Sequence, residues 1–268
     1  MKAEGTDLAP LARRIERAHA AQLERSRVTR VAGSAAVEVG GGLAVCHGPR
    51  SPYSAAVGVG IASPVTPADV DRIESVLGIG GGPVRIEVIP CTDPSLTEEL
   101  GRRGYQLERF FQVWVRAPGG AAPAGGARED GPGPEVRPAT AAEAATWVEL
   151  FSRSHLGAPT QSEAQREALT ALLRADGTQP WLALGDGAPV GVALASCEGG
   201  VSWLSGAGVL PAFRGRGLQM ALVRARLAWA AGMGCDLAAS ATEPGTASQR
   251  TLEGCGFRVA YPKAVLVH

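Results

Sequence analysis

The amino-acid sequence predicts an α/β (α+β) protein of two domains, each with a mixed sheet flanked by helices. Short strand-like segments alternate with helical segments along the whole chain, which is the pattern of such folds. The 268 residues exceed one core of average size. Residues 117–134, APGGAAPAGGAREDGPGP, are almost all Gly, Ala, Pro or charged, so they cannot form a core. We therefore predict a first domain over residues 1–116, a linker over 117–134 and a second domain over 135–268.

The first domain is expected to begin with a helix, because Leu8, Leu11 and Ile15 recur at helical spacing. A later helix begins after Thr66, which can cap it, and has Pro67 at its first position. The other elements of this domain are apolar runs bounded by turn residues. They are strands over residues 35–39, 43–47, 55–61, 84–89 and 107–115, and a helix over residues 97–103.

The second domain shows the same alternation of strands and helices. A hairpin is expected around residues 185–188, and a long helix follows Gly217, where Leu218, Leu222 and Ala225 share one face. The expected strands cover residues 135–137, 181–184, 190–196, 201–210, 235–241, 257–261 and 264–267. The expected helices cover residues 141–154, 162–174, 217–231 and 247–253.

Charge and composition exclude several classes of partner. The formal net charge is +0, so the chain lacks the basic excess that binding to nucleic acid or an anionic membrane requires. No apolar run reaches the ~18–20 residues that span a bilayer, and residues 1–10 do not resemble a signal peptide. The five cysteines are scattered and form no C-x-x-C pair, which is typical of reduced thiols. We therefore expect a cytoplasmic protein with no metal, no nucleic-acid partner and no membrane partner.

The most informative segment is residues 208–222, GVLPAFRGRGLQMAL. A strand is expected to end at Leu210, because Pro211 has no N–H to donate, and a helix follows two glycines and two arginines. The first N–H groups of a helix lack internal partners and carry partial positive charge, and glycines let a phosphate approach the backbone. These features predict a pyrophosphate site. The chain has no G-x-x-x-x-G-K-[ST], and Met220 replaces the third glycine of G-x-G-x-x-G, so nucleotide-binding loops are not favoured.

This segment resembles motif A of the GNAT superfamily of acyltransferases, Q/R-x-x-G-x-G/A preceded by V-x-P-x-x-R. Arg214 and Gly217 match the first and fourth positions, and Gln219 replaces the usual small residue. The resemblance implies that this turn holds the pyrophosphate of acetyl-CoA or another acyl-CoA. It also implies that the strand edge at Val209 and Leu210 pairs with the pantetheine amides, and that each domain has a mostly antiparallel, twisted sheet.

Residues 248–257, SQRTLEGCGF, resemble motif B of the same superfamily, N-x-x-A-x-x-x-Y-x-x-x-G-F. Ser248 and the final Gly-Phe pair are in register, whereas Leu252 replaces the tyrosine that often protonates the departing thiolate. Tyr261, Ser248 or solvent remain as substitutes for that acid. The residues expected to bind the donor are Val209, Leu210, Arg214, Gly215, Arg216, Gly217, Leu218, Gln219 and Ser248.

The first domain repeats part of this pattern. Residues 94–105, PSLTEELGRRGY, resemble the motif B helix, but residues 58–84 contain no arginine-rich turn. The resemblance implies a tandem GNAT-like protein whose first domain has lost its donor site. That domain then has a structural role, or it forms one wall of the acceptor cleft.

Acyl transfer to a primary amine needs a neutral amine, so a carboxylate or a histidine should accept a proton, directly or through water. Three candidate bases are His155 after the first helix of the second domain, Glu198 before its central strand, and Glu243 after the next strand. Nothing near Cys197 activates a thiolate, so we expect direct attack of the amine within a ternary complex.

The sequence leaves the donor, the acceptor and the assembly open. The primary hypothesis is an N-acyltransferase that uses acyl-CoA and a small-molecule amine acceptor. A first alternative is a donor carried by an acyl carrier protein, whose phosphopantetheine enters the same groove. A second alternative is a non-catalytic module that senses CoA or binds a partner. The tandem arrangement is compatible with a monomer or a homodimer.

Overall fold

The computed structural model describes residues 8–27, 31–48, 51–120, 134–155 and 162–268. The chain divides into two compact units, Met1–Val113 with Ala260–His268, and Trp114–Val259. The prediction placed all of residues 135–268 in the second domain, whereas the contacts assign Ala260–His268 to the first unit. Residues 121–133 of the expected linker lie outside the described residues.

The first unit is a sheet with three helices. Its strands follow the order β1-β2-β3-β4-β11, in which β3 and β4 are parallel and the other neighbours are antiparallel. The elements are α1 (Leu8–Arg25), α2 (Pro67–Gly78), α3 (Pro94–Arg102), β1 (Ser34–Val39), β2 (Gly42–His47), β3 (Ala55–Val57) and β4 (Arg85–Val88). Two further strands, β5 (Gln106–Arg116) and β11 (Arg258–Val267), carry residues of both units.

Local sequence explains where these elements begin and end. The predicted cap of α2 is confirmed, because the Thr66 side chain accepts a hydrogen bond from the Asp69 N–H. The α3 helix begins at Pro94, three residues earlier than expected, because Asp93 caps it and proline suits the first helical turn. The β3 strand is shorter than expected because it stops before Gly58, whose φ of +67° lies outside the strand region.

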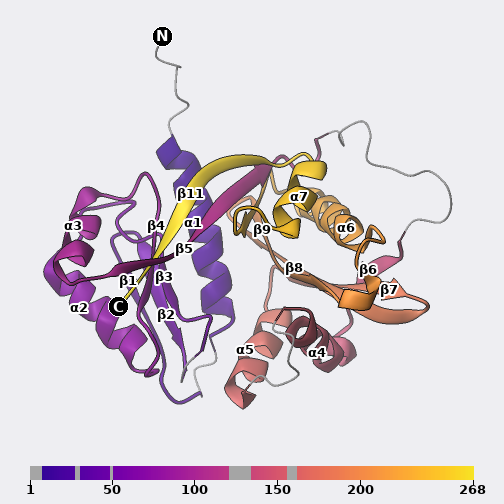
Figure 1. Ribbon diagram of the computed structural model, residues 1–268, viewed down its shortest axis with the longest axis horizontal. Coiled ribbons are helices and arrows are strands. Elements are labelled where there is room, and N and C mark those ends of the chain that lie inside the picture. Colours follow the sequence, from indigo (N-terminus) through magenta and orange to yellow (C-terminus); the bar gives the residue numbers. More distant parts are fainter. Residues whose placement is uncertain (1–7, 28–30, 49–50, 121–133, 156–161) are drawn as a thin grey trace, which may run out of the picture. The chain divides into compact units, whose positions relative to one another are not determined.

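The second unit is a sheet covered on both faces. Its strands follow the order β10-β9-β8-β7-β6; β9 and β10 are parallel, and the other neighbours are antiparallel. The strands are β6 (Val136–Pro138), β7 (Thr178–Gly185), β8 (Ala188–Glu198), β9 (Val201–Val209) and β10 (Leu237–Thr242). The helices are α4 (Ala144–His155), α5 (Glu163–Leu173), α6 (Leu218–Gly232) and α7 (Ala247–Gly254), with short 3₁₀ turns η1 (Ala141–Glu143) and η2 (Pro211–Phe213). The pair α4 and α5 covers one face, and the pair α6 and α7 covers the other (Figure 1).

The predicted fold class, a mixed and mostly antiparallel sheet flanked by helices, is confirmed. The last two expected strands form the single strand β11, which continues through Pro262. Leu252 and Phe257 of the expected motif B are buried with Val223 and Leu227 of α6, so these positions build the core of the second unit. None of the helices in the described part of the chain is long and apolar enough to cross a membrane.

Candidate functional site

The loop between β9 and α6 has an open backbone and an uncapped helix start. Gly215 and Gly217 have φ values of +77° and +79°, and a Cβ on Gly215 would meet nothing within 4 Å. Gly217 is the N-cap of α6, so no side chain caps the helix, and its first turn contains no acidic residue. The N–H groups of Leu218 and Gln219 therefore face outward with the positive end of the helix dipole.

Two exposed arginines flank this loop. Arg214 Nε donates to the Val209 carbonyl at 3.1 Å, and Arg214 Nη2 lies 3.4 Å from the Ser154 carbonyl at the end of α4. Arg216 stacks over the Phe213 ring at 4.9 Å and lies 3.8 Å from Asp186. Arg214 thus fixes the loop to β9 and α4, while both guanidinium groups add positive charge where an anion would bind.

The strands β9 and β10 diverge as they approach this loop. Their parallel ladder covers three residue pairs, from Val201↔Leu237 to Trp203↔Ala239. At the next position Ser240 Oγ donates to the Leu204 carbonyl at 2.8 Å, so a side chain replaces the ladder. The part of β9 that leads to Val209 therefore has no ladder partner in β10, and such an unpaired backbone edge is what an extended, amide-bearing ligand requires.

A bulge shapes the same part of β9. The register of β8 and β9 shifts between Val192 and Leu194, opposite Gly206, whose φ is +57°. Trp147 Nε1 donates at 3.2 Å to the carbonyl of Ala193, the β8 residue that lies opposite the bulge. The fully buried Arg226 of α6 donates to three carbonyls, those of Leu222, Leu194 and Ser205, at 3.0–3.3 Å.

The bulge is therefore held by side chains from α4 and from α6. Burial lowers the pKa of the Arg226 guanidinium to about 10, so it is still charged at neutral pH. Sequence reasoning did not identify Trp147, Gly206 or Arg226 as parts of the site. The run of small residues over 205–208, SGAG, inside an otherwise apolar strand was the available signal.

His155 at the end of α4 lies against β9 just before the loop. A Cβ on Gly208 would come 2.8 Å from His155 Cε1 and 2.2 Å from Ser154 Oγ, so only glycine fits there. The His155 ring packs on Phe151 with centroids 4.3 Å apart, and its Nδ1 lies 3.2 Å from the Phe151 carbonyl. His155 is exposed at the surface, yet desolvation of its ring lowers its pKa, which favours the neutral imidazole that a general base requires.

Comparisons with known proteins identify the family of the second unit. The family model described as Acetyltransferase (GNAT) family matches residues 144–257, which include the β9–α6 loop. Residues 144–257 are a GNAT domain. An aminoglycoside N(6')-acetyltransferase type 1 of Salmonella typhimurium (strain LT2) is 36 % identical over 96 residues. That match spans 32 % of this chain and 66 % of that enzyme, so the chain covers just under two thirds of its relative.

Two solved structures have the same fold over nearly the whole chain. A GCN5-related N-acetyltransferase from Kribbella flavida is 20 % identical with a TM-score of 0.67, covering 99 % of this chain and 96 % of its own. A tandem GNAT protein from the clavulanic acid biosynthesis pathway is 14 % identical with a TM-score of 0.60, covering 97 % and 93 %. At these identities the likeness is one of fold.

The GNAT domain brings some of the expected residues together. Since β9 and β10 are parallel, Val209 and Glu243 follow their strands at the same edge of the sheet. Ser248 is exposed in the first turn of α7, which follows β10. Leu210 donates its N–H to the Val190 carbonyl of β8 at 2.9 Å, so this amide is already occupied.

Two expected catalytic residues do not fit their roles. Glu198 pairs with Val201 at the start of β9, about 26 Å along the strand from Val209 at ~3.3 Å per residue. Tyr261 belongs to the first unit, where it is fully buried and donates to Glu16 Oε1 at 2.8 Å. Burial and the Glu16 carboxylate raise the pKa of Tyr261 well above its ordinary value, so it is a poor acid. We correct both expectations for these physical reasons.

In the first unit, the start of helix α2 is capped by a carboxylate, whereas the start of α6 has no capping side chain. The Asp69 carboxylate accepts hydrogen bonds from the Thr66 N–H at 3.0 Å and from the Thr66 hydroxyl at 2.8 Å. The Thr66 hydroxyl in turn accepts from the Asp69 N–H. The first turn of α2 is therefore occupied by its own carboxylate, which would repel a phosphate.

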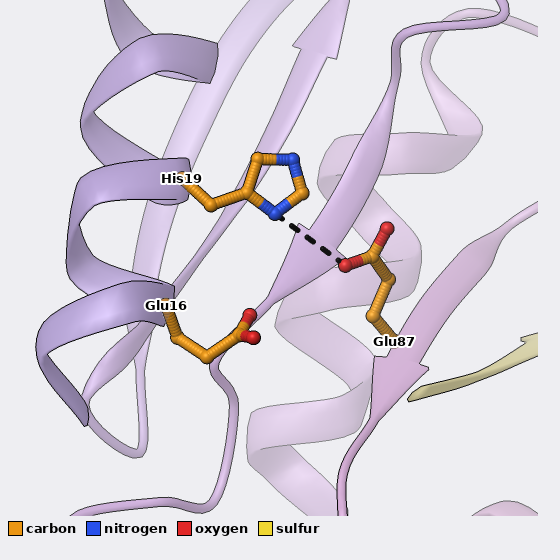
Figure 2. A group of neighbouring side chains, drawn as sticks. All are labelled: Glu16, His19 and Glu87. Carbon is orange, nitrogen blue, oxygen red and sulfur yellow. Dashed lines mark ion pairs between the residues drawn. The ribbon is translucent and has the colours of Figure 1, made fainter. Parts of the chain in front are cut away.

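The first unit also contains a buried polar cluster, formed by Glu16, His19 and Glu87 (Figure 2). One ligand atom from each lies within 4.8 Å of the others, a spacing that could hold a metal ion. Lys263 Nζ lies among them, at 2.9 Å from Glu16, 2.6 Å from Glu87 and 3.3 Å from His19 Nδ1. The ammonium group therefore supplies the positive charge in this cluster. That the chain binds no metal remains an expectation.

The protonation states in this cluster follow from burial and charge. Burial and the Lys263 charge lower the pKa of His19 to about 3, so the ring is neutral and accepts from Lys263. Burial alone would lower the pKa of Lys263, but Glu16 and Glu87 outweigh it and raise the pKa above its ordinary value. The contact of 3.6 Å between His19 and Glu87, dashed in Figure 2, thus joins a neutral ring to a carboxylate.

Proposed function

We propose that this protein transfers an acyl group, most simply acetyl, from acyl-CoA to a primary amine of a small molecule. The observation that carries the proposal is the start of α6. It has no capping side chain, it is preceded by two glycines in the left-handed region, and it lies where β9 and β10 diverge. A diphosphate at the helix start and an amide-bearing arm along β9 are what this arrangement suits.

In this proposal, residues of the β9–α6 loop and of the first turn of α7 bind the acyl donor. The pyrophosphate is held by the N–H groups of Leu218 and Gln219, with Arg216 as the exposed cation. Gly215 and Gly217 keep the approach to the backbone open. Arg214 fixes the loop through the Val209 carbonyl, and the exposed Ser248 at the start of α7 is available to a phosphate or ribose.

The amine attacks the thioester carbonyl carbon directly. Backbone N–H groups of β9 near Val209 polarise the carbonyl, His155 accepts the proton that the amine loses, and the CoA thiolate leaves. The thiolate needs one proton, and the proton that His155 has accepted balances it. Because Leu252 is buried in the core, α7 offers no acid at the position where the tyrosine was expected.

Glu243 is the second candidate base. It is exposed directly after β10, at the same edge of the sheet as Val209. His155 is preferred because it contacts β9 at Gly208, where the reacting carbonyl would lie. The likeness to an aminoglycoside acetyltransferase supports a small amine as acceptor, and it does not identify which one.

The first unit has a structural role in this proposal. The carboxylate cap of α2 leaves no place for a second pyrophosphate at that helix start. One acyl-CoA per chain is therefore expected.

Calorimetric titration with acetyl-CoA and with free CoA tests the donor site. We expect one site of micromolar affinity, weakened at least tenfold by Arg216→Glu, because the reversed charge repels the pyrophosphate. Arg166→Glu is the matched control, since Arg166 is an exposed arginine of α5 and its reversal should leave the affinity unchanged. Failure of the native chain to bind either molecule would overturn the proposal. Thiol release with a panel of primary amines then tests transfer.

A further inference from the structure

Two cysteines of the second unit lie in contact at the end of β9 that is far from the donor loop. Cys197 is the next-to-last residue of β8, and Cys235 follows α6 just before β10. Their sulfur atoms are 3.0 Å apart. Neither is in a disulfide in the structure; Cys197 is partly exposed and Cys235 is 8 % exposed.

The backbone on both sides holds these thiols in place. The Cys197 N–H donates to the Gly177 carbonyl at 2.7 Å, and the Cys235 N–H donates to the Ala230 carbonyl at 3.0 Å. The two residues after Cys235 both donate to the Gly200 carbonyl, which anchors the start of β10 beside the β8–β9 turn. A disulfide needs the sulfur atoms to approach by only about 1 Å more, because an S–S bond is ~2.05 Å long.

We propose that Cys197 and Cys235 form a reversible disulfide. The oxidant is a small disulfide such as oxidised glutathione. The partly exposed Cys197 thiolate attacks one glutathione sulfur, forms a mixed disulfide and releases one glutathione. The Cys235 thiolate then attacks Cys197 Sγ and releases the second glutathione. Two protein thiols are oxidised, one small disulfide is reduced to two thiols, and the two protons pass to the released thiolates.

The bond would join β8 to the start of β10 across the first residues of β9. This is the end where the β9–β10 ladder is intact, and the donor loop lies at the other end of β9. The disulfide therefore stabilises the end of β9 and β10 at which their ladder is intact. It leaves the acyl-donor site unchanged. It also closes a loop of about 38 residues, which restricts the unfolded chain and raises thermal stability.

The other three cysteines serve as internal references. Cys46 and Cys255 are buried, and Cys91 lies in the first unit. Their thiols should stay reduced under conditions that oxidise the proposed pair.

Equilibration of the full-length chain in glutathione mixtures, from fully reduced to fully oxidised, tests the proposal. We expect the count of thiols in the denatured, quenched protein to fall from five to three. Trypsin should then release residues 175–214 joined to residues 227–250, since no lysine or arginine interrupts either peptide. The melting temperature of the oxidised protein should rise by several degrees, and dithiothreitol should reverse both changes.

Variants separate this pair from general thiol oxidation. Cys235→Ser should trap one glutathione on Cys197, because no second thiol is present to release it. Cys91→Ser should still lose two thiols and give the same joined peptides. A native chain that keeps five thiols in fully oxidised glutathione would overturn the proposal, as would a stable glutathione adduct on Cys197 or a disulfide between other cysteines.

Discussion

Gly208 of β9 lies directly beneath His155 of α4, with the position of a Cβ only 2.8 Å from the His155 ring. Helix and strand approach this closely because glycine has no side chain to separate them. The end of α4 can therefore place an imidazole over the strand edge that leads to the donor loop.

Gly208→Ala should impair both packing and catalysis. The added methyl group would meet Ser154 Oγ and the His155 ring, so α4 must move away from β9 at a cost of ~1–3 kcal/mol. We expect kcat to fall more than the affinity for acetyl-CoA, as measured by steady-state kinetics and calorimetry. Gly232→Ala at the end of α6, where a Cβ meets nothing within 4 Å, should change neither. Unchanged kcat in Gly208→Ala would contradict the placement of His155.

His155→Gln should remove the general base. We expect kcat to fall ~10²–10⁴-fold while acetyl-CoA binding is kept. Because desolvation of its ring lowers the pKa of His155, the acidic limb of the native kcat/KM profile should lie below pH 6.5, and the variant should lack that limb. Glu198→Gln should stay within about twofold of the native rate, since Glu198 lies at the other end of β9. A large loss in Glu198→Gln would restore that residue as a candidate.

Arg226→Met should destabilise the second unit by ~2–4 kcal/mol, because it removes the buried guanidinium that donates to the Leu194 and Ser205 carbonyls at the bulge. Urea unfolding measures this loss. Arg224→Met on the exposed face of the same helix should change stability by less than ~0.5 kcal/mol. We also expect Arg226→Met to weaken acetyl-CoA binding, because the bulge that shapes the β9 edge is no longer held. Equal stability of the two variants would show that the bulge needs no such support.

The pH dependence of the free energy of unfolding should contain a contribution from the protonation of His19. The native state keeps the ring neutral with a pKa of about 3, while the unfolded chain binds a proton near pH 6.5. The contribution of His19 to the free energy of unfolding is therefore fully present above pH 6.5 and is lost as the pH falls toward 3. At pH 5 the loss is about 2 kcal/mol. His19→Asn keeps an acceptor for Lys263 and does not titrate, so it should lack this part of the slope. The buried His47, whose pKa is also lowered, contributes equally to both proteins. Identical slopes would exclude His19 as the source.

Short-range features were predicted well from the sequence. The cap at Thr66, the long helix after Gly217 and the β9–α6 loop depend on a few adjacent residues, whose conformational preferences and hydrogen bonds act locally. The same holds for the motif A resemblance, which covers a contiguous segment and led to the GNAT family.

The candidate catalytic residues were predicted less well, because strand direction and long-range packing decide which side chains meet. Glu198 and Glu243 both flank strands of the sheet, but only the parallel pairing of β9 with β10 puts Glu243 at the edge that holds the donor loop. Tyr261 follows motif B in sequence, yet β11 carries it into the first unit.

By itself, then, the sequence determined the class of fold, the glycine-rich turn before α6 and the family of the second unit, since each rests on local patterns of charge, glycine and apolar spacing. Only the tertiary structure decided that His155 lies on Gly208, that Cys197 meets Cys235, and that Lys263 reaches Glu16 across 247 positions of the chain. These contacts join residues far apart in sequence, and they form only when the strands have paired and the helices have packed on them.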